Sequence, residues 1–211
     1  MQTTNLDANT LLFETRWTWY AHFPSASTNY GISYVALGTF STVAEFWRMY
    51  NHLPCIENVH RGRLRVSGTF VIAYSLFREN VRPEWEDPVN LRGSEWGCRE
   101  NLDVHRFREL WKMCVLGAIG ENIPHCVGIR AINKSNRTRN LHKIEVWMNC
   151  ADNRRTQACR KSLSEIVPSS PRFLFMLHTQ KQTQAIEYQK KCQKHGHGAA
   201  PSSADAHEES G

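Results

Sequence analysis

Apolar side chains recur at helical spacing in three segments of the chain, and each segment predicts a helix. The three helices are expected at residues 42–51, 103–120 and 152–166. In the first, Thr42 and Glu45 have the spacing of a capping box. The second and third each begin at an aspartate, a residue type that commonly caps helix N-termini. One apolar face on each helix indicates that all three pack against a core.

Seven stretches between and around these helices are rich in β-branched and aromatic residues. They are residues 13–20, 32–40, 69–77, 95–100, 127–133, 143–150 and 173–179. Several are joined by short links that suit antiparallel pairing, and the helices interrupt them irregularly. The pattern therefore predicts an α+β fold with a mostly antiparallel sheet and helices on one face. The opposite face or the rim of the sheet is then open to a ligand.

The length of 211 residues and the hydrophobic content of 41% are sufficient for one domain with a sizeable core. We expect a polar lead-in over residues 1–12, a domain over 13–185 and a low-complexity, disordered tail over 186–211. No apolar stretch reaches the roughly eighteen residues of a membrane helix, and the N-terminus lacks a secretory pattern. A cytoplasmic protein without membrane contact is expected.

Seven cysteines without a C-x-x-C pair predict reduced thiols, with neither a disulfide framework nor a zinc site. Cys192, His195 and His197 leave two interpretations open, a metal site or a solvated tail. No metal and no other cofactor is predicted. The net charge of +6 favours an anionic partner, and basic residues gather over 60–65 and 130–143.

Trp85 and Glu86 form the pair with the most specific chemistry. An indole stacks on a flat ring, and a neighbouring carboxylate accepts hydrogen bonds from the edge of that ring. A tryptophan in a sheet protein is more often a packing residue, so the pair alone does not establish a site. We read Trp17, Trp19, Trp96 and Trp111 as structural.

Short motifs are spread along most of the chain. They are Arg16 and Trp17, residues 40–43, Phe46 and Trp47, residues 50–52, 74–77 and 83–87, Arg92, Gly93 and Trp96, residues 119–121, Lys143, Ile144 and Trp147, and Asn153 and Arg154. In these motifs and in their order over residues 12–180, the chain resembles the family of the messenger-RNA cap-binding translation initiation factor 4E. The resemblance implies a curved, mostly antiparallel sheet with three helices on its convex face. It also implies a cap slot on the concave face and a protein-docking surface on the helical side.

In this family frame, Trp85 and Tyr30 stack on the cationic 7-methylguanine ring, where cation–π attraction adds to stacking. The resemblance implies that Glu86 accepts hydrogen bonds from N1–H and the exocyclic amine of guanine. Trp147 is expected near the N7 methyl group. The best-known members carry a tryptophan in place of Tyr30.

The resemblance places Lys134 and Lys143 at the cap phosphates. Arg137 and Arg139 lie in a longer loop, which either supplies further phosphate contacts or is a solvated hairpin tip. Glu95 stands where the family usually has a basic residue, so a weaker or altered phosphate grip is expected unless its carboxylate points away or is paired with Arg92.

The resemblance also implies that Val43 and Trp47 on the first helix, with Leu116 and Gly120 on the second, bind a helical peptide. The partner is expected to be a scaffold protein of the initiation factor 4G type or a repressor, in a heteromeric complex with one copy of this chain. Read without the family, Trp47 is a core residue of its helix.

Three functions are compared. The first is binding of capped messenger RNA in translation initiation or its regulation. The second is an interaction module of the same fold that has lost useful cap affinity. The third, an enzyme, is disfavoured because we find no phosphate-binding glycine loop, no metal-ligand spacing and no nucleophile in a motif. The insertion before Tyr74 is either a surface loop or a contact for another protein or RNA.

Overall fold

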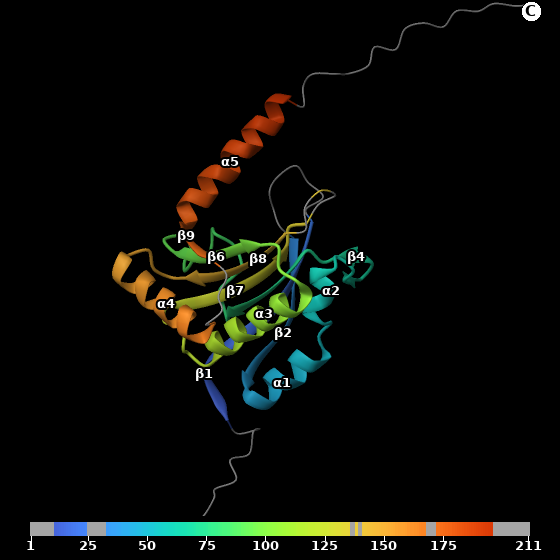
Figure 1. Ribbon diagram of the computed structural model, residues 1–211, viewed down its shortest axis with the longest axis vertical. Helices are drawn as coiled ribbons and strands as arrows, with labels where there is room; N and C mark the ends of the chain where they lie inside the picture. Colours follow the sequence, from blue (N-terminus) through green and yellow to red (C-terminus); the bar gives the residue numbers. More distant parts are fainter. Residues whose placement is uncertain (1–10, 25–32, 136–137, 139–140, 168–171, 196–211) are drawn as a thin grey trace, which may run out of the picture.

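The computed structural model describes residues 11–24, 33–135, 138, 141–167 and 172–195, and a curved seven-stranded sheet lies at its centre (Figure 1). The strand order is β2-β1-β5-β7-β8-β6-β9, and every neighbouring pair is antiparallel. The strands are β1 Leu12–Phe23, β2 Ser33–Thr42, β5 Ala73–Arg78, β6 Ser94–Glu100, β7 Cys126–Asn133, β8 His142–Met148 and β9 Phe173–Leu177. The predicted fold class is confirmed.

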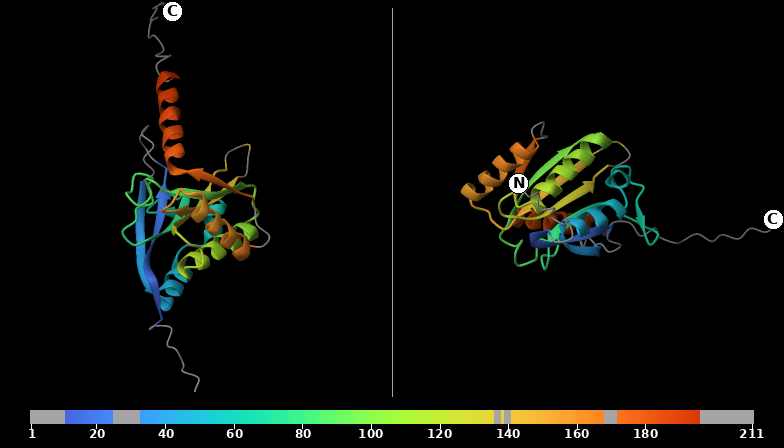
Figure 2. Two further views of the ribbon diagram at one scale, coloured as in Figure 1. Left: turned by 90° about the vertical axis from the view of Figure 1, so that its left-hand side faces the viewer. Right: turned by 90° about the horizontal axis from the view of Figure 1, so that it is seen from below.

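Three helices cover the convex face of the sheet, as predicted (Figure 2). They are α1 Val43–His52, α3 Val104–Ile119 and α4 Asn153–Ile166. Their first turns carry the expected caps. Thr42 and Glu45 form the complete capping box, and the carboxylates of Asp103 and Asp152 accept backbone hydrogen bonds at 2.9 and 3.0 Å. Local sequence therefore determines where these helices begin.

Two further helices make five in the described chain, rather than the three predicted. They are α2 Ile56–His60 and α5 His178–His195. The short helix α2 is fixed by burial of Ile56 and Val59, a signal too brief to show a helical period. Helix α5 is mostly polar and projects away from the sheet (Figure 1). It extends past the expected domain end at residue 185, and residues 196–211 lie outside the described chain.

The predicted strand over 69–77 is interrupted in the structure. Its first part is β4 Thr69–Phe70, which pairs with β3 Arg65–Val66 in a separate two-stranded sheet. Val71 then donates a backbone hydrogen bond to Leu64 at 2.9 Å, and Ile72 donates one to His22. The chain therefore leaves the small hairpin before it enters β5, and the unbroken run of apolar residues in this stretch conceals the break.

The main core lies between the sheet and the helices, and Trp17, Trp19, Trp96 and Trp111 are all buried there, as predicted. Strand alternation gives β8 two different faces. Ile144, Val146 and Met148 pack in the main core, whereas Trp147 belongs to a smaller cluster with Phe77, Val81 and Val127. This second cluster lies on the concave face and underlies the candidate site.

Within the described part of the chain, no helix is long and apolar enough to cross a membrane. The same residues contain no group of three histidine, cysteine, aspartate or glutamate side chains that is arranged to bind a metal ion. Six cysteines there are free thiols. Cys192, His195 and His197, the candidate metal residues of the tail, lie outside the described side chains.

Candidate functional site

The loop between β5 and β6 carries Trp85 and Glu86, and two buried side chains hold its shape. The Asp87 carboxylate accepts hydrogen bonds from two backbone amides of the loop, including that of Arg82 at 3.0 Å. Asn90 donates from Nδ2 to two backbone carbonyls of the loop, each at 2.8 Å. Asp87 accepts and Asn90 donates hydrogen bonds across the loop, so the backbone that presents Trp85 and Glu86 is held in one conformation.

The Trp85 ring offers a flat apolar surface, and the Glu86 carboxylate beside it is a hydrogen-bond acceptor. Trp85 is half-buried, and its ring lies nearly parallel to that of Trp147, with 6.4 Å between centroids and 12° between planes. Glu86 is exposed, and no residue in the described chain binds its carboxylate. A ring that stacks on Trp85 can therefore present its edge to Glu86.

Trp147 forms the floor of the site and is fully buried. The Phe77 ring packs edge-on against the Trp147 ring, with 5.3 Å between centroids. The Trp147 Nε1 donates a hydrogen bond to the Glu145 carboxylate at 3.1 Å. Gly128 lies opposite Trp147 on β7, and a side chain at this position would collide with the Phe77 ring. The absence of a Cβ at Gly128 thus allows Phe77 to support Trp147.

The first turn of α5 closes one side of the site. His178 lies 4.4 Å from Trp147 between ring centroids, and its backbone amide donates to the Gly93 carbonyl at 3.1 Å. Its Nδ1 donates to the Asn90 carbonyl at 2.8 Å, which fixes the tautomer. Burial lowers the pKa of His178 to about 4, so the ring is neutral at neutral pH.

Five ionic side chains form a buried group next to Trp147, here called the charge cluster. They are Glu95 on β6, Arg130 on β7, Lys143 and Glu145 on β8, and Lys181 on α5. Arg130 binds Glu145 at 2.7 Å, Lys143 binds Glu95 at 2.9 Å and Lys181 binds Glu145 at 3.0 Å. Three cations against two carboxylates leave a formal charge of +1.

The two carboxylates of the charge cluster differ in their surroundings. Burial by itself would raise the pKa of Glu145, but Arg130, Lys181 and Lys143 together hold it well below the usual value. Burial and the nearby charge of Glu145 raise the pKa of Glu95, and Lys181 and Lys143 offset this only in part. Glu145 is therefore the anion on which the three cations depend most.

The predicted phosphate-binding residues differ in their exposure and in their ionic partners. The Lys143 ammonium contacts Glu95 and Glu145 and is only slightly exposed. Glu95 is paired with Lys143 and Lys181 rather than with Arg92, whose side chain is exposed. Lys134 is exposed just beyond the end of β7. Three further predicted residues, Tyr30, Arg137 and Arg139, lie outside the described residues.

The predicted partner surface lies on α1 and α3. Trp47 is 39% exposed and packs edge-on against Phe46 at 4.9 Å, so it is not a core residue. Val43 and Leu116 are half-buried, and Gly120 is exposed. The neighbouring Leu11 and Leu12 are exposed as well, and the Leu11 carbonyl accepts the Val43 amide hydrogen bond at 3.0 Å.

Comparison with protein families identifies the group to which this fold and these motifs belong. The family described as eukaryotic initiation factor 4E matches residues 12–194 of the chain. The chain belongs to this family. Among its relatives are initiation factor 4E-1 of Pisum sativum, 30% identical over 79% of this chain and 70% of its own, and 4E-2 of Arabidopsis thaliana, 28% identical over 81% and 68%.

Solved structures of the initiation factor 4E family share the fold. The complex of C. elegans eIF4E-3 with the 4E-binding protein Mextli and cap analog matches with a TM-score of 0.65 and 21% identity, over 82% of this chain and 95% of that one. Schistosome eIF4E complexed with m7GpppG and 4E-BP matches with a TM-score of 0.65 and 19% identity, over 82% and 91%.

Four residues around the site of this initiation factor 4E family member were not found from the sequence, namely Arg130, Glu145, His178 and Lys181. A signal was present for two of them. Alternation along β8 places Lys143, Glu145 and Trp147 on one face, and Arg130 pairs with Glu145 in the register of β7 and β8. No comparable signal existed for His178 and Lys181, because α5 itself was not predicted.

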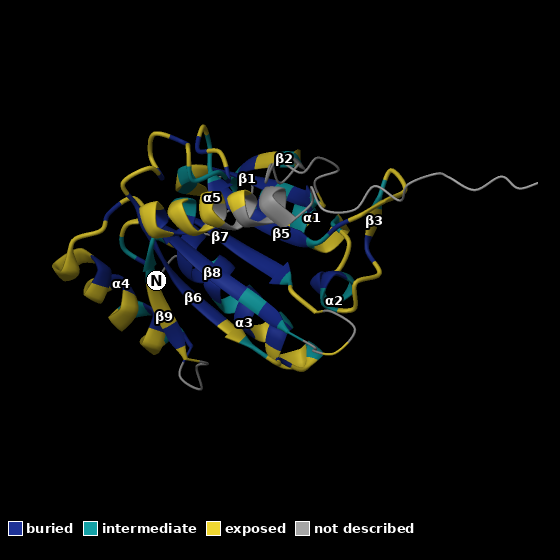
Figure 3. Cartoon of the chain, turned by 90° about the horizontal axis from the view of Figure 1, so that it is seen from above, coloured by how far each residue is buried: buried dark blue, intermediate teal, exposed yellow. Residues whose placement is uncertain are grey.

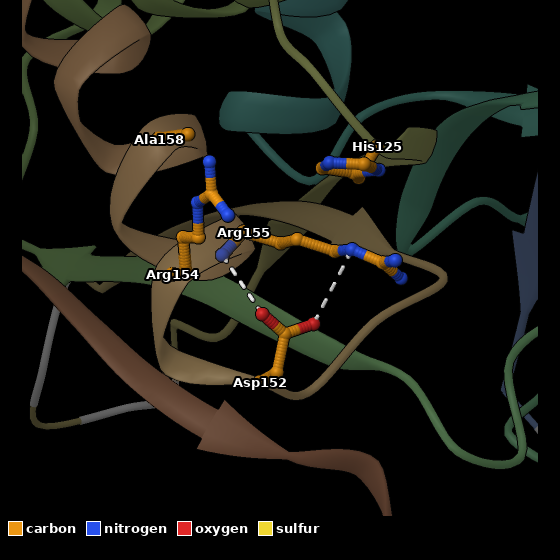
Figure 4. A pocket seen from close by; sticks show the side chains of 5 residues that line it. All are labelled: His125, Asp152, Arg154, Arg155 and Ala158. Atoms are coloured by element: carbon orange, nitrogen blue, oxygen red, sulfur yellow. Dashed lines mark hydrogen bonds and ion pairs between the residues drawn. The ribbon is translucent and has the colours of Figure 1, made fainter.

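A shallow cavity of about 540 Å³ lies at the start of α4 (Figure 4). It is lined by His125, Asp152, Arg154, Arg155 and Ala158. The Asp152 carboxylate accepts the Arg155 backbone hydrogen bond and pairs with its guanidinium at 3.6 Å, as the dashed lines show. None of the predicted site residues that the structure describes lines this cavity, so it is separate from the Trp85 site.

Proposed function

We propose that the protein binds the 7-methylguanosine cap of messenger RNA and acts, without catalysis, in translation initiation or its regulation in the cytoplasm. The observation that carries this proposal is the half-buried Trp85 ring beside the exposed Glu86 carboxylate, on a loop fixed by Asp87 and Asn90. Family relatives solved with a cap analog and with m7GpppG support it.

Each residue of the base site has one role in the proposal. Trp85 and Tyr30 stack on the two faces of the methylated ring, whose positive charge adds cation–π attraction. Glu86 accepts the N1–H and amine hydrogen bonds, a contact that adenine does not offer. Trp147, fully buried beneath the site, packs near the methyl group.

The cap phosphates are assigned to Lys134 and Lys143, with Arg137 and Arg139 as further contacts. The carboxylates of Glu95 and Glu145 already neutralise much of the Lys143 charge. A triphosphate therefore gains less from Lys143 than from an unpaired lysine, so we expect base recognition to contribute most of the affinity.

Retention on immobilised 7-methyl-GTP tests the proposed function. The wild-type protein is expected to be retained, and free 7-methyl-GTP is expected to elute it while GTP does not, because only the methylated base is cationic. Equal elution by both nucleotides would remove the cation–π part of the mechanism. Absence of retention would contradict cap binding altogether.

The charge cluster favours one alternative, an interaction module of the same fold with little cap affinity. Glu95 and Glu145 lower the positive potential where a triphosphate would lie. A titration with 7-methyl-GTP followed by tryptophan fluorescence separates the two functions. Stacking on Trp85 quenches emission, whereas the alternative gives a flat titration at high cap concentration.

Val43, Trp47, Leu116 and Gly120 are proposed to bind a helical peptide of a scaffold of the initiation factor 4G type or of a repressor. An exposed tryptophan between half-buried apolar neighbours is a typical anchor for such a helix. The solved relatives bound to Mextli and to 4E-BP support this assignment. The working unit is then a heteromeric complex with one copy of this chain.

The variant Trp47→Ala is expected to lower the affinity for a helical initiation factor 4G peptide by roughly thirtyfold, the usual effect of removing an interface anchor. Fluorescence anisotropy of a labelled peptide measures it. Affinity for 7-methyl-GTP should not change, because Trp47 lies on the convex side. Leu174→Ala on β9, another exposed apolar residue, is the control. Unchanged peptide affinity in Trp47→Ala would place the partner elsewhere.

A further inference from the structure

The segment over residues 61–70, here called the basic hairpin, is exposed but firmly anchored. Leu64 and Val71 are buried at its base, with 5% and 2% of their surfaces exposed, and their backbones are joined by a hydrogen bond of 2.9 Å. Arg63 and Arg65, on either side of Leu64, are both exposed. The basic hairpin is thus an ordered projection from the core.

A flat stack of two planar groups forms the tip of the basic hairpin. Arg65 on β3 pairs in register with Phe70 on β4, and its guanidinium carbon lies 3.7 Å from the centre of the Phe70 ring. A hydrogen bond from Arg65 Nη1 to the Gly68 carbonyl at 2.8 Å fixes the guanidinium. Phe70 remains 45% exposed. An aromatic face and an ordered cation are therefore presented together.

The positive charge of the basic hairpin is not neutralised within the described chain. Arg61, Arg63 and Arg65 are all exposed, and none of them forms an ion pair with a carboxylate that the structure describes. The nearest acidic residue in sequence, Glu57, is paired with Arg108 at 3.0 Å. Three available cations beside an aromatic ring match the needs of a single-stranded nucleic acid.

The basic hairpin is attached to the end of β7 and the start of β8. Asn133 donates from Nδ2 to the backbone carbonyls of Val59 and His60, each at 3.0 Å. The His60 ring stacks on that of His142, with 3.9 Å between centroids and 8° between planes. Figure 3 shows α2 and β3 beside this end of the sheet. The position of the basic hairpin relative to the concave face is therefore fixed.

Strand β8 links the proposed cap site to the region where the basic hairpin is attached. Trp147, Glu145 and Lys143 lie on one face of β8, and Lys143 is about 13 Å from Trp147 at the usual rise of a strand. His142, the next residue towards the start of β8, has its ring on the opposite face, where it stacks on His60 just before the basic hairpin and packs against Phe107. The basic hairpin is therefore attached at the end of β8 towards which an RNA with its first base at Trp85 and its phosphates near Lys143 would run.

We propose that the basic hairpin binds the single-stranded RNA that follows the cap. The three arginines contact phosphates, and Phe70, backed by the Arg65 guanidinium, stacks on one base. Such contacts do not distinguish between bases, so binding is independent of sequence. The direction of the RNA rests on the proposed cap function, whereas binding to the basic hairpin itself does not.

The first experiment compares three ligands of the wild-type protein by fluorescence competition. They are 7-methyl-GTP, a capped oligoribonucleotide of about twelve nucleotides, and the same oligoribonucleotide without the cap. Twelve nucleotides is about the length that single-strand binding proteins cover. The capped oligonucleotide is expected to bind at least tenfold more tightly than 7-methyl-GTP. That tenfold advantage is expected at about 200 mM salt. With three phosphates neutralised, it should be roughly twentyfold larger at about 50 mM.

The second experiment compares two triple variants with the same change in net charge. Arg61→Ser, Arg63→Ser and Arg65→Ser together should reduce the affinity for the capped oligonucleotide to that for 7-methyl-GTP. The control, Arg154→Ser, Arg155→Ser and Lys161→Ser on α4, should leave it unchanged. Phe70→Leu keeps the charge and removes the ring, and is expected to lose roughly fivefold or more. Unchanged 7-methyl-GTP affinity shows that each variant is folded.

Three results would overturn the proposal: a capped oligonucleotide that binds no more tightly than 7-methyl-GTP, a control triple variant that loses as much as the hairpin variant, or an unaffected Phe70→Leu. Polyglutamate that competes as well as RNA would also overturn it, in favour of an acidic protein partner. If the wild-type protein does not bind 7-methyl-GTP, only the proposed cap function is contradicted. Binding of the uncapped oligonucleotide then still tests the basic hairpin, and thermal unfolding shows whether each variant is folded.

Discussion

Replacing Glu86 with glutamine is expected to lower the affinity for 7-methyl-GTP about 100-fold, because two charge-assisted hydrogen bonds and the attraction to a cationic base are lost together. A glutamine amide has one acceptor oxygen, and its NH₂ group faces a donor on the base. The exposed carboxylate has no partner in the described chain, so the free energy of unfolding should not change.

Isothermal titration with 7-methyl-GTP measures this loss, and thermal unfolding measures stability. Glu109→Gln on α3 is the matched control, since it removes one exposed carboxylate far along the chain from the loop. The control should bind as wild type. If Glu86→Gln also bound as wild type, Glu86 would not be the base-reading residue, and the assignment of the loop as the cap site would be wrong.

The parts of the fold that the sequence predicts well are those decided locally. Thr42, Asp103 and Asp152 cap the helices that they were expected to cap, because a cap depends on bonds to residues only three positions away. Trp85 and Glu86 are neighbours in sequence, so one loop carries both side chains regardless of the tertiary structure. A local signal was enough in each case.

The charge cluster could not be predicted in the same way, because its members come from four separate elements. Lys181 reaches Glu95 and Glu145 from the first turn of α5, a helix without an apolar stripe. Its position depends on tertiary contacts such as that of His178 with Asn90. Glu95 was expected to repel phosphate, and its two lysine partners became visible only in the fold.

Replacing Glu145 with glutamine is expected to lower the free energy of unfolding by about 3–5 kcal/mol, the usual cost of removing one partner from a buried ion pair. Glu145 is 1% exposed and binds Arg130, Lys143 and Lys181. Without its charge, Arg130 would have no carboxylate partner in the described chain, and Lys143 and Lys181 would share Glu95 alone. Urea denaturation at neutral pH measures the loss.

The control for this variant is Glu165→Gln, which changes net charge equally at an exposed pair with Lys161 and should cost well under about 1 kcal/mol. A urea midpoint for Glu145→Gln equal to that of the control would show that the cations are solvated rather than buried with Glu145. The charge cluster would then have no structural role.

The stability that Glu145 contributes has a defined dependence on pH. Its pKa in the folded protein lies well below the usual value of 4.5, because Arg130 and the two lysines outweigh the effect of burial. The unfolded chain therefore takes up a proton first as the pH falls below about 4.5. The contribution is complete above that pH and is lost as the pH falls towards the folded pKa. The difference between wild type and Glu145→Gln should narrow over the same range.

A paired substitution separates the cost of an unpaired charge from the value of the ion pair itself. In Arg130→Met with Glu145→Leu, both buried charges are replaced by apolar side chains of similar size, which is often neutral or stabilising in a protein interior. The double variant is therefore expected to be more stable than Glu145→Gln. If it were less stable, the hydrogen bond that a glutamine at position 145 can still accept from Trp147 would outweigh the cost of leaving Arg130 unpaired.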